Sequence, residues 1–142
     1  MSSTIEAQGN CLCGAVTIKA KSMSTEVGAC HCGSCQKWTG GPLMTVDCKS
    51  DVEIEGREHV SVFQSSEWAE RAFCGRCGSN LYYRLKQTNQ YIVPAGLFDT
   101  EQLQFDHQIF VDEKPKYYAF SNDTKMMTGA EVFALFASTE AE

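Results

Sequence analysis

The sequence has only three prolines, no long hydrophobic run and no excess of basic residues. Its longest strongly apolar stretch, Val132 to Ala137, is six residues long, whereas a membrane-spanning helix needs about 20. The first ten residues carry neither a basic start nor an apolar segment, so we expect no secretory signal, a cytoplasmic protein and no membrane partner. Acidic residues outnumber basic ones, 18 to 12, and the net charge of −6 argues against nucleic acid as a partner.

Length and composition are those of one ordinary globular domain. The chain has 142 residues, of which 43% are hydrophobic and 21% charged. These values exclude a disordered, collagen-like or low-complexity protein. A chain of this length buries roughly two thirds of its unfolded surface, enough for a core. No repeat or linker divides the chain, so we predict a single domain over residues 1–142.

Alternation of apolar and polar residues with a period of two runs through much of the chain and predicts half-buried strands. The predicted strands cover residues 16–19, 52–56, 60–64, 69–73, 81–85, 91–95 and 109–111. Glycines and polar residues separate them at short intervals, which favours a mainly β, antiparallel architecture. Short helices are predicted over Gln36–Thr39, ended by Gly40, and over Ala130–Ala137.

Cysteine is the residue type that this sequence has in excess. Seven of the eight cysteines fall into three tight groups, with Cys48 standing apart. Disulfide frameworks usually spread cysteines over the loops of a secreted chain, and no export signal is evident here. Clustered thiols in a chain expected to stay in a reducing compartment indicate metal binding, and zinc is the metal that they suit best.

The number of cysteines in each group predicts how two metal ions would share them. The groups are a doublet (Cys11, Cys13), a triplet (Cys30, Cys32, Cys35) and a second doublet (Cys74, Cys77). A structural zinc takes four ligands, whereas a catalytic zinc keeps three protein ligands and one open position. Only the two doublets together supply four thiolates. We therefore predict a closed structural site on them, with a redox dithiol at the second doublet as the alternative, and an open site on the triplet.

The triplet is the candidate catalytic site. Three thiolates around Zn²⁺ leave one net negative charge, which damps its power to activate water and favours a soft thiol as the fourth ligand. The predicted chemistry is the capture of a substrate thiol as thiolate, its nucleophilic form. The alternative is that Cys48, His59 or His107 closes the site. His31 is not expected to do so, because it alternates with Cys30 and Cys32 on an extended segment.

Four segments resemble the glutathione-dependent formaldehyde-activating enzyme family, which also contains centromere protein V. They are Gly9–Val16, Cys30–Lys37, Arg71–Ser79, and a weaker pair formed by Ala95–Asp99 and His107–Phe110. The resemblance covers about residues 9–120. It implies a tent-like, mainly β zinc fold with a structural zinc on Cys11, Cys13, Cys74 and Cys77 and a catalytic zinc on Cys30, Cys32 and Cys35.

The resemblance also implies a reaction and a substrate. The family reaction is the condensation of formaldehyde with glutathione to S-hydroxymethylglutathione, which in the reverse direction is the chemistry of a carbon–sulfur lyase. Two departures are Asn10, where glycine is usual, and Tyr117, where a late tryptophan is common. Centromere protein V makes a non-catalytic zinc-binding interaction module the alternative, although the basic extension that would support it is missing from the first ten residues.

Other residues near the motifs have a structural interpretation that we prefer. Glutathione carries two carboxylates, so its pocket needs basic groups. The basic residues nearby are Lys37, Arg71, Arg76 and Arg84, and we expect them to be solvated or salt-bridged at the surface. We expect Trp38 to pack in the core rather than line a pocket. His107 is expected to be a hydrogen-bonded structural histidine, with proton transfer as the alternative.

Overall fold

The computed structural model describes residues 3–140, and the side chains of residues 3–136 within them. The strands are β1 (Thr4–Asn10), β2 (Thr17–Ser24), β3 (Glu26–Cys30), β4 (Leu43–Asp47), β5 (Val52–Glu55), β6 (Val60–Phe63), β7 (Ala69–Cys74), β8 (Asn80–Leu85), β9 (Gln90–Pro94), β10 (Gln104–Ile109) and β11 (Lys125–Met127). The α-helices are α1 (Gly33–Thr39) and α2 (Gly129–Glu140), and short 3₁₀ turns cover Arg57–His59, Ala95–Leu97 and Val111–Glu113. The predicted mainly β class is confirmed.

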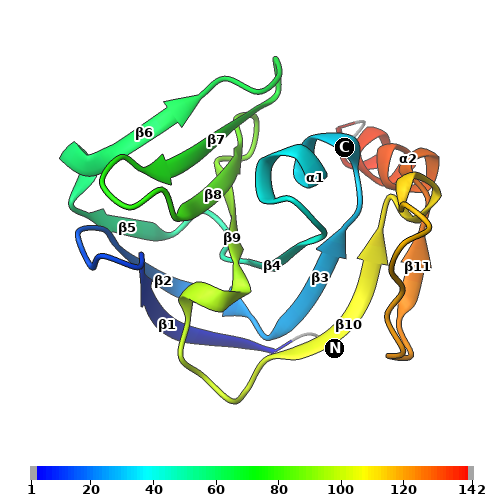
Figure 1. Cartoon of the computed structure of the whole chain (residues 1–142), viewed down its shortest axis with the longest axis horizontal. Coiled ribbons are helices and arrows are strands. Elements are labelled where there is room, and N and C mark those ends of the chain that lie inside the picture. Colours follow the sequence, from blue (N-terminus) through cyan, green and yellow to red (C-terminus); the bar gives the residue numbers. More distant parts are fainter. Residues whose placement is uncertain (1–2, 141–142) are drawn as a thin grey trace.

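The strands form two sheets that share one core (Figure 1). The smaller sheet has the order β1-β2-β5 and the larger one the order β11-β10-β3-β4-β9-β8-β7-β6. Alternation along β2 buries Ile18 and Ala20, and alternation along β9 buries Tyr91 and Val93. These inward side chains belong to one apolar cluster, as expected when two half-buried sheets pack face to face.

One part of the antiparallel prediction is wrong. β10 pairs in parallel with β3 on one side and with β11 on the other, whereas the remaining ladders are antiparallel. A parallel pair needs a long crossover connection, and about half of the chain separates β3 from β10. Their register sets His107 opposite Gly28, where a Cβ would lie 2.1 Å from the His107 Nε2 atom. Only glycine lets the imidazole cross the backbone of β3 this closely.

Four predicted strands end one or two residues earlier than the alternation suggested, among them the last two. The strand predicted through Val111 stops at Ile109, because Phe110 adopts a left-handed conformation with φ of 55° and a 3₁₀ turn follows. The strand predicted through Ala95 stops at Pro94 for a similar reason, since the next three residues form a 3₁₀ turn. Both turns redirect the chain at an end of the large sheet, which a local period of two does not report.

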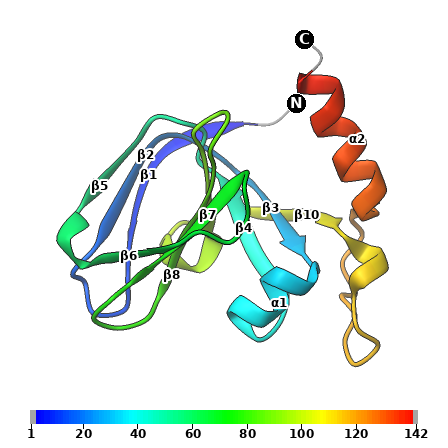
Figure 2. The ribbon, with the colours of Figure 1, turned by 90° about the horizontal axis from the view of Figure 1, so that it is seen from above.

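The helices follow the prediction with one change. α2 contains the predicted range Ala130–Ala137 and lies at the far end of the molecule from the smaller sheet (Figure 2). α1 ends before Gly40, whose φ of 86° fits the predicted glycine stop. It begins at Gly33, however, not at Gln36, so that Cys35 lies in its first turn. None of the helices in the described part of the chain is long and apolar enough to cross a membrane.

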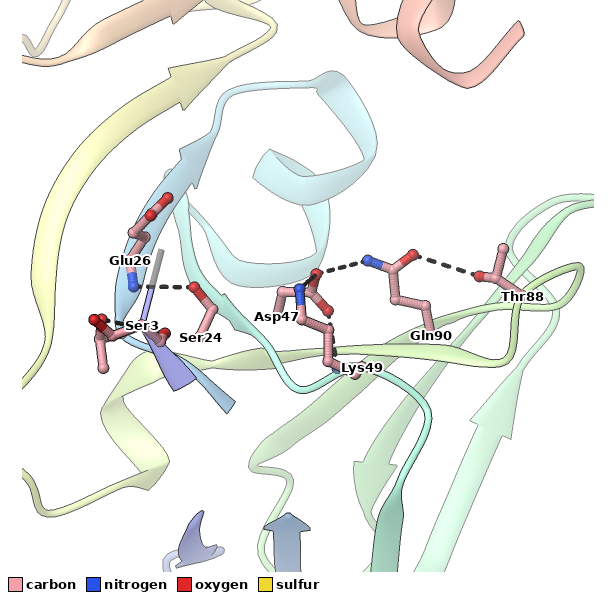
Figure 3. A network of polar contacts seen from close by, with 8 residues as sticks. Ser3, Ser24, Glu26, Asp47, Lys49, Thr88 and Gln90 are labelled. Carbon is pink, nitrogen blue, oxygen red and sulfur yellow. Dashed lines mark hydrogen bonds and ion pairs between the residues drawn. The ribbon is translucent and has the colours of Figure 1, made fainter. Parts of the chain in front are cut away.

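Polar side chains tie the strands together at the edge of the core (Figure 3). Asp47, at the end of β4, pairs with Lys49 at 3.1 Å and accepts a hydrogen bond of 2.8 Å from the Gln90 side chain of β9. In the tight turn between β2 and β3, the Ser24 hydroxyl accepts a hydrogen bond from the backbone N–H of Glu26 at 3.2 Å. The first contacts hold the end of β4 against the start of β9. The last one closes the turn into β3, the strand that leads into α1.

Candidate functional site

The first cysteine cluster joins the two sheets. Cys11 and Cys13 lie in the turn between β1 and β2, Cys74 ends β7, and Cys77 lies in the turn that follows. Their four sulfurs all lie within 4.8 Å of one another. Two sulfur–sulfur distances, 3.6 Å from Cys11 to Cys13 and 3.8 Å from Cys13 to Cys74, match the edge of about 3.8 Å in a tetrahedron with Zn–S bonds of about 2.3 Å. The donor set and its spacing fit one zinc ion.

Backbone geometry points these sulfurs inward. One turn carries Cys11 and Cys13, and the other carries Cys74 and Cys77. Each turn is followed by a glycine with positive φ, Gly14 at 82° and Gly78 at 78°. Backbone N–H groups then donate to sulfur, from Val16 to Cys11 at 3.3 Å and from Arg76 to Cys74 at 3.4 Å. Such donors stabilise thiolates without being ligands themselves.

Ser79 supports the exposed side of this cluster. Its hydroxyl lies 3.3 Å from the Cys77 sulfur and accepts a hydrogen bond from the Leu12 N–H at 3.0 Å. The Ser79 hydroxyl and backbone lower the pKa of Cys77 to about 5. Ser79 therefore favours the ionised form of Cys77, which is the form that binds metal.

The second cluster forms where β3 runs into α1. Cys30 is the last residue of β3, Cys32 is the N-cap of the helix, and Cys35 lies in the first turn. Their sulfurs lie within 4.8 Å of one another. The Cys32 sulfur accepts the Cys35 N–H at 3.4 Å, so one thiolate closes the helix start in place of the usual serine or aspartate. The β-strand, the cap and the helix turn thus aim three sulfurs at one point.

The three thiols of this cluster oppose one another's ionisation unless a cation lies among them. The neighbouring thiols of Cys30 and Cys35 hold the pKa of Cys32 far below its usual value, and the same contacts raise the pKa of Cys30 strongly. One thiolate is therefore stabilised at the expense of the next, as expected for ionisable groups that share a small volume. All three can ionise together only around a positive ion. The cluster has the donor chemistry of a zinc site with three thiolates.

The structure places the candidate fourth ligands elsewhere. Among the described residues, no Cys, His, Asp or Glu joins the group formed by the three sulfurs. Cys48 is buried in the apolar core, and burial raises its thiol pKa to about 12. His59 lies 3.7 Å from Glu58, and the His107 Nδ1 atom lies 2.6 Å from an oxygen of Asp106. Among the described residues, the three sulfurs of the second cluster therefore have none of these candidate fourth ligands beside them, and the open site stays a prediction.

His31 faces away from the sulfurs, as predicted, and holds their loop in place. It is fully buried, with Nε2 2.8 Å from the Gln108 side-chain oxygen and Nδ1 2.7 Å from the Tyr118 hydroxyl. An amide oxygen only accepts, so the Nε2 atom carries a hydrogen and donates it to Gln108, while the Nδ1 atom and the Tyr118 hydroxyl share the second hydrogen bond. Gln108 donates in turn to Thr124 at 2.9 Å. Sequence reasoning missed Gln108 and Tyr118, which lie about 80 residues further along the chain.

The basic residues near the motifs are not equivalent. Lys37 and Arg76 are exposed, and Arg84 forms a two-pronged pair with Glu70 at 2.9 and 3.2 Å, as expected. The surface expectation is wrong for Arg71, which is only 6% exposed and donates to the Cys35 sulfur at 3.6 and 3.7 Å. The core expectation is also wrong for the half-buried Trp38, whose ring lies 5.0 Å from the Arg71 guanidinium carbon.

Comparisons with known proteins agree with this geometry. Residues 6–113 match the family model described as "Glutathione-dependent formaldehyde-activating enzyme". An "uncharacterized lyase" of Schizosaccharomyces pombe is 39% identical over 129 residues, which cover 89% of this chain and 94% of that protein. A "putative glutathione-dependent formaldehyde-activating enzyme" of Halomonas elongata is 32% identical over 84 residues, covering 53% of this chain and 54% of that one. A crystal structure of a Rhodobacter sphaeroides protein shares the fold, with a TM-score of 0.56, 23% identity, and coverage of 68% of this chain and 90% of that one.

Proposed function

The chain belongs to the glutathione-dependent formaldehyde-activating enzyme family, and from that premise we propose that it is a carbon–sulfur lyase-type enzyme that acts on the aldehyde adduct of a small thiol. Glutathione is the thiol that the family name supports. The observation that carries the proposal is the convergence of three sulfurs, from Cys30, Cys32 and Cys35, with no fourth protein ligand among the described residues. A site of this kind has room for a ligand from outside the chain.

The two clusters have different roles in this proposal. Cys11, Cys13, Cys74 and Cys77 hold a structural zinc that links the two sheets, because four sulfurs within 4.8 Å of one another supply the number of ligands that such an ion takes. Cys30, Cys32 and Cys35 hold the second zinc and leave one position for the substrate. A zinc ion bound there would keep the substrate thiol ionised, which makes it nucleophilic at neutral pH. The non-catalytic module requires a fourth ligand that the described chain does not bring to this cluster.

The reaction needs little more from the protein than binding and orientation. The thiolate sulfur attacks the carbonyl carbon of formaldehyde, a C–S bond forms, and the carbonyl oxygen takes up one proton to become a hydroxyl. The thiol loses one proton on binding, so the net reaction joins thiol and aldehyde without oxidation, and its reversal breaks the same C–S bond. The chain holds the sulfurs through β3, the cap of α1 and the buried His31 contacts, which keep their loop in one geometry.

Metal content and turnover test the proposal together. Purified protein should contain two zinc ions per chain and should accelerate the exchange between free formaldehyde, glutathione and S-hydroxymethylglutathione, measured by exchange NMR with ¹³C-formaldehyde. Cys35→Ser should lose one zinc and the acceleration while keeping the fold. Cys48→Ser is the matched control, because Cys48 is buried but belongs to neither cluster, and it should keep both ions and full activity. Acceleration that survives in Cys35→Ser would contradict the proposal.

A further inference from the structure

Arg71 is a buried cation without a carboxylate partner. It lies in β7, is only 6% exposed, and forms none of the ion pairs found among the described residues. Its Nε atom is buried and has no hydrogen-bond partner there. Arginine is almost never buried without a paired anion. The two terminal nitrogens of Arg71 both contact the Cys35 sulfur, at 3.6 and 3.7 Å, so the anion that balances this guanidinium is the thiolate cluster.

Two aromatic rings hold the guanidinium at this sulfur. Its central carbon lies 5.0 Å from the centre of the Trp38 ring and 4.7 Å from that of Tyr83. Trp38 comes from α1, the helix that carries Cys35, and Tyr83 stands opposite Arg71 in the β7–β8 ladder. Two cation–π contacts favour a planar guanidinium over an ammonium group. The guanidinium of Arg71 is therefore held between residues of the large sheet and of α1.

The charge of the occupied site explains what Arg71 could do. A zinc ion with three thiolates carries one net negative charge, and a substrate thiolate would raise that to two. Adding an anion to a site that is already negative is unfavourable in a partly desolvated environment. One positive charge directly beside Cys35 reduces this cost. The nearest alternative cation on the neighbouring strand, Arg84, is already paired with Glu70 at 2.9 Å and cannot serve this purpose.

We propose that Arg71 is a positioning residue that balances the charge of the Cys30/Cys32/Cys35 site and thereby lets it accept an anionic fourth ligand, a substrate thiolate. The inference rests on the function proposed above and adds a residue to it. The guanidinium acts through Cys35 and does not transfer a proton. Without it, the site would still bind metal, but a thiol would bind as thiolate only at higher pH.

Cobalt-substituted full-length protein provides the test, because the cobalt spectrum reports thiolate coordination without turnover. Glutathione is titrated at several pH values into the wild type, Arg71→Gln, Arg71→Lys and the control Arg84→Gln. A nearby opposite charge lowers a pKa by about one to three units, so Arg71→Gln should move the pH midpoint of thiolate binding upward by that amount and weaken binding at pH 7 about 10- to 1,000-fold. Arg71→Lys should shift by less than about one unit. Arg84→Gln should match the wild type.

The other possible results of this titration would overturn either the role of Arg71 or the proposed function. Arg71→Gln with the wild-type pH midpoint overturns the charge-balance role, even if its melting temperature falls. If Arg71→Gln does not fold, Arg71→Lys decides: a folded lysine variant without thiolate binding overturns the role, because the charge is still present. A wild-type cobalt spectrum that does not respond to glutathione at any pH overturns the proposed function, and the role of Arg71 with it. A response in the wild type and an equal one in Arg71→Gln refutes only the role of Arg71.

Discussion

Replacing Cys74 by serine should separate the structural role of the first cluster from ordinary core packing. Cys74 is fully buried at the end of β7, and its sulfur accepts the Arg76 N–H at 3.4 Å. Serine brings a shorter, harder oxygen to a corner that a thiolate occupies, so the tetrahedron loses one ligand. Because this cluster joins the β1–β2 turn to the β7–β8 hairpin, the loss should loosen the contact between the two sheets.

The expected cost follows from the metal. Structural zinc contributes about 10–16 kcal/mol to folding in small zinc domains, so one ligand of four accounts for roughly 2.5–4 kcal/mol. A buried hydroxyl without a good partner adds about 1–3 kcal/mol. Cys48→Ser carries only the second cost, since Cys48 is equally buried and lies outside both clusters. In a domain of this size, the difference between the two variants should be roughly 10 °C in melting temperature.

Calorimetry and zinc analysis on the two variants measure this difference directly. Cys74→Ser should hold its structural zinc far more weakly and melt well below Cys48→Ser, and a strong chelator, which removes the ion altogether, should lower the melting temperature of the wild type at least to that of Cys74→Ser. Equal melting temperatures for the two serine variants, with equal zinc content, would refute the assignment of a folding role to this cluster. The fold would then rest on the shared apolar core alone.

Three further outcomes follow from single contacts. Tyr118→Phe removes the hydroxyl that bonds buried His31 and should cost about 1–3 kcal/mol in denaturant unfolding; an unchanged midpoint would show that the ring finds another partner. Gly56→Ala should destabilise strongly, because φ is +81° and the new Cβ would lie 2.0 Å from the Ala15 carbonyl oxygen, so a soluble variant with wild-type melting would contradict the geometry. A hydrogen-bonded arginine lowers the pKa of Glu70. This carboxylate therefore adds stability above its unfolded pKa that is lost as the pH falls, and Glu70→Gln should flatten the acid side of the stability profile.

The sequence was enough to predict features whose signal is local. The cysteine spacings pair residues two or three positions apart, and the structure brings them into the two predicted groups. Alternation revealed β2 and β9 because one face of each is buried. It missed β3, where Val27, Gly28 and Ala29 are all buried and no alternation remains. The parallel pairing of β3 with β10 depends on segments about 80 residues apart, and no local pattern reports it.

The residues that contact the Cys30/Cys32/Cys35 cluster could not be predicted either, because they also come from distant parts of the sequence. Arg71 looks like a surface residue in the sequence, because strand alternation alone does not show that a helix carrying Trp38 covers it. The contact between His31 and Tyr118 spans 87 positions. Both contacts join segments that lie far apart in the sequence, so the two cysteine groups could be predicted while the residues that contact them could not.

The Tyr118 contact has a consequence for how relatives could diverge. Residues 6–113 match the family model, yet the hydroxyl that anchors His31 comes from beyond that range. Two proteins could therefore share every sulfur and still differ in the stiffness of the loop that presents them. Grafting the tail of one member onto the body of another would be a direct way to retune such a centre without altering its ligands.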